Sequence, residues 1–393
     1  MRRFNWVVVM TAIAAAALFA VACGDDDDDN DSSEDDADDD AGDDDTDAVP
    51  AFLSVVTFNA GLAHGFVPYA DERVSAVGQA LAELDTHLAC LQEVWEPEDI
   101  ASILAETEAN FPYVHRQDSH ADWLELPDEP APCDDLTDVL DCAEANCSDV
   151  SGAEFTDCML LGCIFDLSQL EIPCFNCLAA NIDKSIDDIA DVCTNPGPPP
   201  LQYEGANGLL VLSKFPLSET SALELDYFLI TRLVLHARVE TDNGPVHAYC
   251  THLSTDISGL PYHGTFEDFA EENLAQAEAI LEFIDETSNG EPAVLLGDFN
   301  SGPDTDALDG NYADTWDTLS GAFHDPLFAG SPDVCTWCSD NPLTDMDRDA
   351  MIDHVFFSGF DTDALSASVI FDEDAGSTPR LSDHYGVRAT YGN

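Results

Sequence analysis

Short apolar runs alternate with amphipathic stretches in two long parts of this 393-residue chain, and a cysteine-rich block separates the two parts. The first run, Leu53–Phe58, is rich in β-branched residues and stops at a turn sequence, which predicts a strand. Residues 71–84 carry apolar side chains at helical spacing. A strand at 88–91, a helix at 98–109 and a strand at 111–115 follow. This order is typical of an alternating α/β fold.

The alternation resumes after the cysteine-rich block, and no internal repeat is present. An amphipathic helix is predicted at 268–283. The later predicted strands are 207–213, 229–239, 246–253, 293–296, 352–358, 365–371 and 386–391. Asn243-Gly244 predicts a hairpin turn between two of them.

Eight of the 13 cysteines lie between residues 133 and 193. We interpret residues 119–200 as a disulfide-stapled insertion with short helices and no catalytic motif. Eight cysteines allow 105 pairings, and the sequence does not choose among them. The insertion is expected to form one side of a substrate site or a docking surface, with a rigid decoration as the alternative. Zinc binding by its cysteines is a further alternative.

The N-terminus has the features of an export signal. Arg2 and Arg3 precede an apolar run that ends in Ala20-Val-Ala-Cys-Gly24, which is similar to a bacterial lipobox. We predict that residues 1–23 are a lipoprotein signal peptide and that Cys23 carries the lipid. Ordinary secretory cleavage is the alternative. In either case we expect an exported protein, anchored by lipid in the bacterial cell envelope (outer membrane or cell surface) or secreted. The twelve other cysteines then read as disulfides, which suit an oxidising compartment.

Acidic residues dominate the chain, which has 80 Asp and Glu against 11 Lys and Arg and a formal net charge of −69. Residues 24–48 hold sixteen of these acids and no base, which predicts a solvated, disordered tether before a domain at 49–393. The remaining charge repels polyanions, so no stable nucleic-acid partner is expected. An adaptation to salty water is an alternative explanation of the charge.

Polar residues of four types stand at the ends of the predicted strands. They are Asn59, Glu93, His252, Asp298, Asn300, Asp353, Asp383 and His384. Carboxylate and amide oxygens hold hard cations such as Mg²⁺. A bound cation offsets phosphate charge, and a histidine paired with a carboxylate moves protons or stabilises developing charge. The set therefore points to metal-assisted hydrolysis of a phosphoester.

Seven short motifs, in a fixed order, give the chain a resemblance to the endonuclease/exonuclease/phosphatase superfamily, which includes deoxyribonuclease I and bacterial sphingomyelinases. The motifs are Val55–Asn59, Leu91–Glu93, Asn207–Ser213, Thr251–Leu253, Gly297–Asn300, Ile352–His354 and Ser382–His384. The resemblance covers residues 52–118 and 201–392. It implies a four-layer α/β/β/α sandwich, in which two mixed sheets pack face to face with helices outside.

The resemblance also implies a metal site. Glu93 matches the main metal-binding glutamate of the family, and Asn59 matches the asparagine that helps to bind the metal or the phosphate. Asp383 matches an acidic residue that is often a metal ligand. The implied cofactor is Mg²⁺, with Mn²⁺ or Ca²⁺ as alternatives, and the resemblance leaves open whether one ion or two are bound.

Five further residues match catalytic positions of the family. His252 resembles the histidine that contacts the phosphate or assists the leaving group. Asp298 matches the aspartate that positions or deprotonates the attacking water, and Asn300 matches the companion that orients that water. His384 resembles the second catalytic histidine, and Asp353 the carboxylate that orients its ring.

Several residues outside this set need separate interpretations. Arg232, on a predicted strand, is a candidate phosphate-binding residue, and a surface ion pair is the alternative. Surface or packing roles are expected for His236, His247, His263 and His354. Cys335 and Cys338 have the spacing of a redox motif without its strand-to-helix context, so a local structural disulfide is favoured.

A sphingomyelinase-like phospholipid head-group phosphodiesterase is the favoured function, because an acidic surface accepts a zwitterionic substrate. Thr336-Trp337 also resembles a stretch in those enzymes. The alternatives are an extracellular endonuclease or deoxyribonuclease, an inositol-phosphate or other phosphomonoesterase, and a non-enzymatic surface binding lipoprotein. The expected partners are a phosphoester substrate, for which a phospholipid is one candidate, and a membrane that the N-terminal lipid anchor binds. The protein is expected to be a monomer.

Overall fold

The computed structural model describes residues 52–117, 129–150, 153–181, 184–198, 201–241, 244–256, 262–344, 348–373, 375–376 and 378–392. The predicted signal peptide, the lipidation site Cys23 and the acidic tether fall outside these residues. Residues 118–128, at the predicted start of the insertion, and Asn243 of the predicted turn do so as well. These features therefore stay predictions.

The described strands form two mixed sheets. The six-stranded sheet has the order β10 (Leu365–Ile370), β11 (Gly386–Tyr391), β1 (Leu53–Asn59), β2 (Leu88–Gln92), β4 (Leu210–Ser213) and β3 (Tyr113–His115). The five-stranded sheet has the order β5 (Leu217–Glu224), β6 (Leu233–Thr241), β7 (Gly244–His252), β8 (Ala293–Asp298) and β9 (Asp353–Ser358). In each sheet one neighbouring pair, β1 with β2 and β7 with β8, runs parallel.

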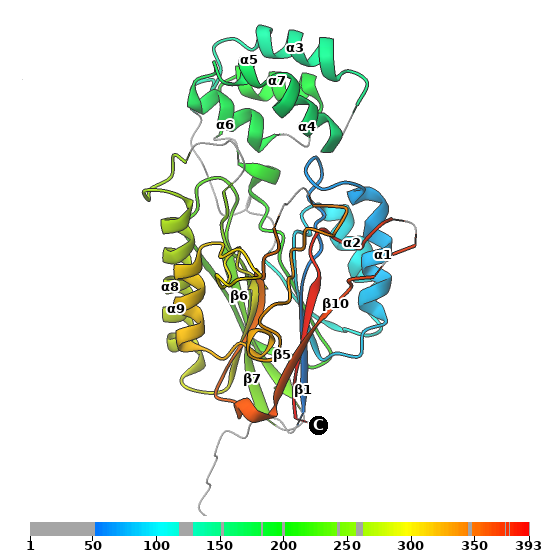
Figure 1. Ribbon diagram of the computed structural model, residues 1–393, viewed down its shortest axis with the longest axis vertical. Helices are drawn as coiled ribbons and strands as arrows, with labels where there is room; N and C mark the ends of the chain where they lie inside the picture. Colours follow the sequence, from blue (N-terminus) through cyan, green and yellow to red (C-terminus); the bar gives the residue numbers. More distant parts are fainter. Residues whose placement is uncertain are drawn as a thin grey trace, which may run out of the picture. The chain divides into compact units, whose positions relative to one another are not determined.

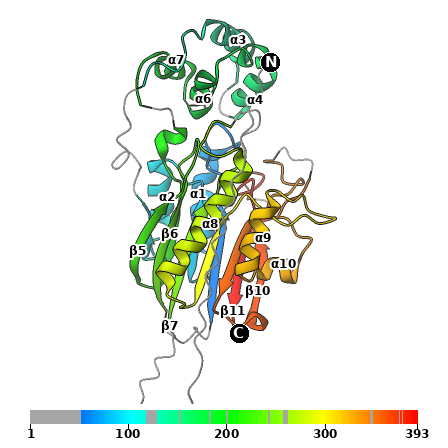
Figure 2. The ribbon, with the colours of Figure 1, turned by 90° about the vertical axis from the view of Figure 1, so that its left-hand side faces the viewer.

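Helices cover the outer faces of both sheets, as Figures 1 and 2 show. Helices α1 (Ala70–Ala82) and α2 (Pro97–Thr107) lie over the six-stranded sheet, and α8 (Phe269–Ser288) and α9 (Ala313–Ala322) lie over the five-stranded sheet. A short helix, α10 (Pro326–Gly330), and a 3-10 turn, η3 (Thr362–Ala364), complete this part of the chain. The predicted four-layer α/β/β/α sandwich is confirmed.

Strand alternation explains how one chain builds three apolar layers. Successive residues of a strand point to opposite faces. Val55 therefore packs between the two sheets, whereas Val56 packs against α1 and α2. In β8, Val294 likewise faces the other sheet and Leu295 faces α8. Strands that are buried on both faces read as continuous apolar runs, which is why the sequence revealed them.

A disulfide also joins the two sheets. Cys90 of β2 and Cys250 of β7 are bonded in the layer between the sheets, although they are 160 residues apart in the sequence. This bond ties together the two strands that lead into Glu93 and His252, two of the predicted site residues.

Five short helices make up the described part of the insertion. They are α3 (Thr137–Cys147), α4 (Ala153–Gly162), α5 (Ile164–Leu167), α6 (Ile172–Ala180) and α7 (Ile186–Thr194), which group together in Figure 1. Four disulfides link them: Cys133–Cys174, Cys142–Cys163, Cys147–Cys158 and Cys177–Cys193. The expected disulfide-stapled character is confirmed, while the boundaries 119–200 stay a prediction.

Some elements differ from the sequence expectation. Strand β5, α9 and α10 were not expected, and the predicted strand 229–239 begins only at Leu233. β5 is an edge strand with a mostly polar, half-exposed sequence and an irregular register between Ser218 and Ser221, so it lacks the alternation that marks a strand. The shifted start of β6 places Arg232 in the loop before the strand.

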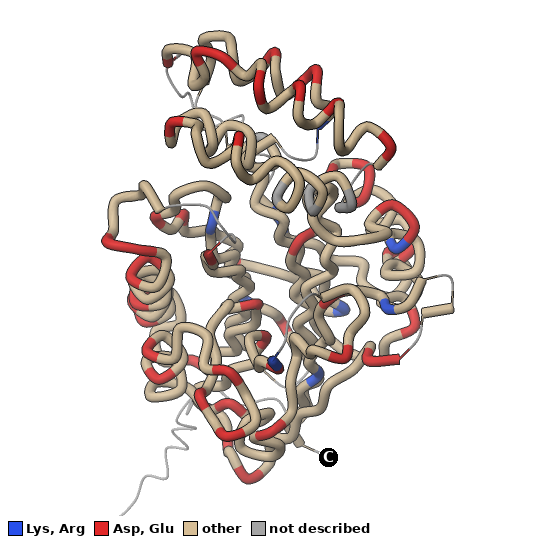
Figure 3. Tube along the Cα trace, turned by 45° about the horizontal axis from the view of Figure 1, so that its top comes forward, with Lys and Arg blue, Asp and Glu red and all other residues tan. Residues whose placement is uncertain are grey.

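Asp and Glu residues are spread along the backbone of the described elements, and Lys and Arg residues are few among them, as Figure 3 shows. Among the described helices, none combines the length and the apolar character needed to cross a membrane.

Candidate active site

The strand ends bring most of the predicted site residues to one edge of the sandwich. His252 is the last residue of β7 and pairs with Asp298, the last residue of β8. Asp298 pairs in turn with Asp353, the first residue of β9. Paired residues on adjacent strands share a face of the sheet. One row across the five-stranded sheet therefore carries His252, Asp298 and Asp353.

The six-stranded sheet contributes the opposite side of the cluster. Asn59 ends β1 and pairs with Gln92, the last residue of β2, so Glu93 follows directly. The Asn59 side-chain nitrogen donates to Glu93 Oε1 at 2.9 Å and to Asp298 Oδ2 at 2.8 Å. Its Oδ1 accepts a hydrogen bond from the Gly61 backbone. Asn59 thus holds together two carboxylates that come from different sheets.

Burial and mutual repulsion disfavour the charged forms of these carboxylates. Burial, with the neighbouring Asp383, raises the pKa of Glu93. Burial and then Asp353 raise the pKa of Asp298 to about 7. Carboxylates gathered in this way are the ligands that a hard divalent cation needs, and the cation would favour their charged forms.

Two site residues have left-handed backbone conformations, which non-glycine residues rarely adopt. Glu93 follows β2 with φ 56°, and Asn300 follows β8 with φ 50°. The Asn300 backbone N–H donates to Asp298 Oδ1 at 2.8 Å, and its side-chain nitrogen donates to the Leu253 carbonyl at 3.0 Å. Strained residues of this kind concentrate at functional sites, where the surrounding contacts hold them in place.

His384 lies in the turn before β11, and its Nδ1 is 2.9 Å from Asp353 Oδ2. Burial lowers the pKa of His384, but the carboxylates of Asp353, Asp298 and Asp383 outweigh it, so the pKa lies well above its usual value. Asp353 Oδ1 is buried and has no hydrogen-bond partner among the described residues. The His384 ring is therefore oriented by Asp353 and favours its protonated form.

His252 has the opposite character. Its Nε2 lies 3.5 Å from Asp298 Oδ2 and 4.0 Å from Glu93 Oε1. Burial, and then the charges of Arg232 and His384, hold the pKa of His252 well below its usual value. The site thus pairs a histidine that favours its neutral form with one that favours its charged form, which is the separation that acid–base chemistry uses.

Asp383 lies next to the loop after β1. A Cβ atom built on Gly61 would lie 2.2 Å from Asp383 Oδ1, and Gly61 has φ +56°. Only glycine fits this position, because a side chain would displace the carboxylate. Asp383 accepts a hydrogen bond from Ser382 Oγ, while its neighbour His384 turns to Asp353.

Arg73 of α1 was not expected to belong to the site. Its guanidinium is fully buried and donates to the carbonyls of Ala60 and Leu381 at 2.8 Å, and also to that of Gly61. It therefore ties the loop that follows Asn59 to the loop that carries Asp383. Sequence reasoning gave no signal for this, since an arginine on an amphipathic helix reads as an exposed residue.

Arg232 is buried, with 3% of its surface exposed, so the alternative of a surface ion pair is wrong. Its Nε and Nη1 atoms have no hydrogen-bond partner among the described residues. Burial lowers the pKa of Arg232 to about 10, although the carboxylates of Glu93, Asp298 and Glu272 oppose this effect. Unpaired guanidinium donors beside the carboxylate cluster suit an oxyanion that binds there.

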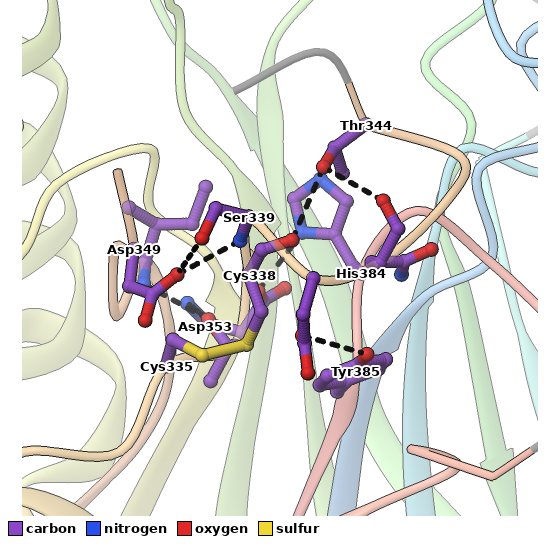
Figure 4. The surroundings of a disulfide bond; sticks show 12 residues. Cys335, Cys338, Ser339, Thr344, Asp349, Asp353, His384 and Tyr385 are labelled. Carbon is purple, nitrogen blue, oxygen red and sulfur yellow. Dashed lines mark hydrogen bonds and ion pairs between the residues drawn. A yellow bond between two sulfur atoms is a disulfide. The ribbon is translucent and has the colours of Figure 1, made fainter. Parts of the chain in front are cut away.

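A disulfide-closed loop supports the His384 turn (Figure 4). Cys335 and Cys338 are bonded, as predicted, and the ring of Trp337 between them stacks on His384 with a centroid distance of 6.0 Å. The Asn341 side-chain nitrogen donates to the carbonyls of Ser382 and Asp383, each at 2.9 Å. The loop thus fixes the backbone on either side of the catalytic candidate.

The four histidines expected to have surface or packing roles lie outside the cluster. His263 is exposed. His354 is buried and bonds to Asp325 at 2.8 Å. His236 and His247 are bonded to each other at 2.8 Å on β6 and β7.

Two groups within the described residues have ligand atoms that all lie within 4.8 Å of one another: Glu93, His252 and Asp298, and Asp298, Asp353 and His384. The predicted metal set of Asn59, Glu93 and Asp383 shares Glu93 with the first group. Buried carboxylate oxygens, one of them without a partner, fit a divalent cation.

Comparisons with known proteins agree with this geometry. The model of the Endonuclease/Exonuclease/phosphatase family matches residues 56–384. No curated protein sequence matches the chain.

Solved structures share the fold at low sequence identity. The structure of SmcL is 14% identical, with a TM-score of 0.55 over 87% of this chain and 100% of that chain. Sphingomyelinase C from Streptomyces griseocarneus is 14% identical, with a TM-score of 0.52 over 87% of this chain and 99% of that one. Truncated Caenorhabditis elegans TDP2 is 13% identical, with a TM-score of 0.50 over 87% and 98%.

Proposed function

The chain belongs to the endonuclease/exonuclease/phosphatase family, and from this premise we propose that it is an exported, Mg²⁺-dependent phosphodiesterase that cleaves phospholipid head groups. Members of this family generally hydrolyse phosphoester bonds and typically use divalent metal ions. The observation that carries the proposal is the contact of Asn59 with both Glu93 and Asp298, which unites carboxylates from two sheets at the strand ends.

Glu93, Asn59 and Asp383 would hold the cation, because they offer the hard oxygen ligands that Mg²⁺ prefers. Mn²⁺ or Ca²⁺ are the alternatives. When bound, the ion supplies charge that offsets the phosphate and polarises a phosphoryl oxygen.

The residues around this position would act on the attacking water and the phosphate. Asp298 would position the attacking water or accept its proton, since its carboxylate lies at the strand ends between Asn59 and His252. Asn300 would orient that water. His384, held by Asp353, would keep its proton and stabilise the negative charge that develops on the phosphate. His252 would contact the phosphate or assist the leaving group, and the free donors of Arg232 would bind a phosphoryl oxygen.

The charge of the chain favours a zwitterionic phospholipid over a polyanion. A formal net charge of −69 repels nucleic acid, whereas a phosphocholine head group is zwitterionic and has no net charge. Sphingomyelinase C from Streptomyces griseocarneus has the same fold, which supports a head-group substrate by analogy.

Export and lipid anchoring are part of the proposal. All twelve cysteines of the described residues are bonded in six pairs, which suits an oxidising compartment. Expression of the full chain and of Cys23→Ser, followed by membrane fractionation, tests the anchor. Equal membrane association of the two proteins would argue against lipidation at Cys23.

The activity is tested with purified residues 49–393 in Mg²⁺ and then in chelator. Sphingomyelin, lysophosphatidylcholine, double-stranded DNA and inositol phosphates are offered in parallel. His384→Ala is compared with His263→Ala, the same change at an exposed histidine.

Release of phosphocholine that stops with chelator and with His384→Ala, but not with His263→Ala, is the expected result. Nicking of the DNA would indicate an endonuclease and not a phospholipid phosphodiesterase. Release of inorganic phosphate would indicate a phosphomonoesterase. Absence of turnover with Mg²⁺, Mn²⁺ and Ca²⁺ would favour a non-enzymatic binding lipoprotein.

A further inference from the structure

The loop between β5 and β6 carries Arg232 at its end. The Leu225 backbone N–H donates to the Arg232 carbonyl at 2.9 Å, which closes residues 225–232 into one loop. Residues 228–230 (Phe228 to Ile230) form the tip of this loop, between its two hydrogen-bonded ends. Whatever holds the tip therefore also constrains the backbone from which the guanidinium extends.

The insertion contacts this tip through α6. Ala180, the last residue of α6, and Leu229 of the loop are both buried in one apolar cluster, with 1% and 5% of their surfaces exposed. Phe175 and Ala179 of α6 pack against the same cluster, together with Phe228 and Ile230. The contact is apolar, and it is the main contact of α6 outside the insertion among the described clusters.

Gln202 joins the helix to the loop by hydrogen bonds. It is fully buried, in the 3-10 turn η2 (Gln202–Gly205) that follows the insertion. With its amide nitrogen facing α6, its side chain donates to the carbonyls of Ala179 at 2.7 Å and Ala180 at 3.2 Å. Its backbone N–H donates to the Leu229 carbonyl at 3.4 Å. The last carbonyls of a helix have no hydrogen-bond donors within the helix. At the end of α6, the Gln202 side chain supplies the donors.

The inner side of the tip packs against the site. Ile230 contacts a cluster of Ala63, Trp95 and Tyr203. Trp95, two residues after Glu93, stacks on Tyr203 with a centroid distance of 4.9 Å, and its ring lies 6.3 Å from that of His252. The loop tip thus lies between α6 of the insertion and aromatic rings that border the site.

Helix α8 holds the other part of the loop. The Gln276 side-chain nitrogen donates to the Asp226 carbonyl at 2.7 Å. The first half of the loop is therefore fixed by the sandwich. The tip, which leads to Arg232, contacts the sandwich through Phe228 and Ile230, and it also contacts α6 and Gln202.

We propose that the disulfide-stapled insertion positions the phosphate-binding arginine: α6 and Gln202 fix the loop tip, and the tip fixes Arg232 beside Glu93 and Asp298. This inference rests on the proposed function for the role of Arg232, and it makes Gln202 a positioning residue. The four disulfides hold the insertion together, so α6 packs against the loop as part of a rigid unit.

Gln202→Glu tests the proposal, because it keeps the size of the side chain but replaces the donor with a carboxylate that faces two carbonyls. Gln169→Glu is the matched control, since Gln169 is exposed in the insertion and the change in charge is the same. Phe175→Ala, compared with Phe165→Ala at a 73% exposed position, is a second pair should Gln202→Glu fail to fold.

The first measurement is hydrogen exchange of the backbone amides of residues 225–232, which does not depend on any activity. Faster exchange in Gln202→Glu and Phe175→Ala, but not in the controls, is expected, with β7 and β8 unchanged. Unchanged exchange of the loop would overturn the proposal whether or not the protein is a phosphodiesterase.

The second measurement is the affinity for inorganic phosphate in the presence of Mg²⁺, with KM and kcat on a small chromogenic phosphodiester. Gln202→Glu should weaken phosphate binding and raise KM by about tenfold, because residues coupled through a backbone shift interact by amounts of this order. The same change in an Arg232→Ala background should have no further effect. A full additional tenfold loss in that background would show that the insertion does not act through Arg232 and would overturn the proposal.

The two hypotheses fail in different ways. If wild-type protein neither binds phosphate nor cleaves any phosphoester, the proposed function is lost. If it does both and the loop is held as described, but Gln202→Glu binds phosphate as wild type does, only the positioning role is lost.

Discussion

The sandwich (residues 52–117 and 201–392) and the insertion (residues 129–198) solve the problem of stability by different means. Three apolar clusters stabilise the sandwich, one between its sheets and one under each helical layer. The insertion has one small cluster, in which six of the thirteen buried residues are cysteines. It also leaves large apolar side chains exposed, such as Leu161 at 83% and Phe165 at 73%.

The difference follows from size. A small unit buries a smaller share of its surface than a large one, so its apolar side chains cannot all be covered. Disulfides offset this by reducing the freedom of the unfolded chain. The sandwich contains a single disulfide between its sheets. Its apolar core is large enough that several titratable groups can also be buried away from water. Chemistry of the kind proposed needs such groups, and among the described residues the sandwich holds them.

The largest effect on activity should therefore come from a substitution in the sandwich that replaces one carboxylate oxygen. Asp353→Asn keeps the shape of the side chain but no longer stabilises a protonated His384, whose Nδ1 lies 2.9 Å away. We expect kcat to fall roughly a thousandfold, the order of a general acid–base contribution. Steady-state kinetics measure this, and titration with Mg²⁺ should show intact metal binding.

Asp363→Asn serves as the control, because Asp363 is exposed on η3. Turnover of Asp353→Asn equal to that of this control would remove Asp353 from the mechanism.

Removal of one disulfide from the insertion should lower the stability of the insertion and leave the stability of the sandwich almost unchanged. Cys177 and Cys193 close a 16-residue span, so replacing both by Ser should cost the insertion about 3 kcal/mol. Trp95, Trp316 and Trp337 all lie in the sandwich, and residues 129–198 contain no Trp or Tyr. Trp123, in the predicted start of the insertion, is replaced by Phe for all fluorescence measurements, so that the signal reports on the sandwich. Urea unfolding followed by tryptophan fluorescence should hardly change, while amide exchange in α6 and α7 should speed up. Equal shifts in both signals would mean that the two regions unfold as one unit.

Acid should weaken the sandwich through a histidine that the site does not use. Burial, and then the neighbouring His247 and His115, lower the pKa of His236 to about 4. The unfolded chain therefore binds a proton first, near pH 6.5, and the folded state loses stability as pH falls from about 6.5 to about 4. The loss is on the order of 2–3 kcal/mol, since one pH unit corresponds to about 1.4 kcal/mol for one group.

His236→Gln should have a shallower dependence of unfolding free energy on pH within this window, measured by urea unfolding. A slope equal to that of the wild type would assign the acid sensitivity to other groups. The insertion, whose amides are followed by exchange, should be insensitive to this substitution.

Helix caps should give the smallest effect and a similar one in both regions. Ser185 Oγ accepts from the Asp188 N–H at the start of α7, and Asp268 Oδ1 accepts from the Glu271 N–H at the start of α8. Ser185→Ala and Asp268→Ala should each cost about 1 kcal/mol. Only Asp268→Ala should move the tryptophan unfolding curve, because α8 packs on the five-stranded sheet. A shift from Ser185→Ala would again indicate one cooperative unit.

Much of the sandwich could be predicted because its signals are local. An apolar run followed by a polar residue marks a buried strand and its end, and this was enough to find Asn59, Glu93 and Asp298. β5 could not be found in this way, since a half-exposed edge strand with a polar sequence lacks the pattern. Arg73 was missed for a similar reason, because its burial depends on carbonyls from loops far along the chain.

The insertion could be recognised from its cysteines, but its disulfide pairing could not. The spacing of eight cysteines is compatible with many pairings, and the observed one joins Cys133 to Cys174 and nests Cys147–Cys158 inside Cys142–Cys163. The contact of α6 with the loop before Arg232 likewise has no signature in the sequence, because apolar side chains such as Leu229 do not specify their partners.

The sequence by itself determined the kind of fold, the strand ends and the chemical types of the site residues, because each depends on residues that are close along the chain. Tertiary structure decided which of them meet. It placed Asn59 between carboxylates of two sheets, buried Arg232 without a partner, and brought the insertion onto the loop that carries it. These features depend on packing between distant segments, where burial and charge are set by neighbours that the local sequence does not contain.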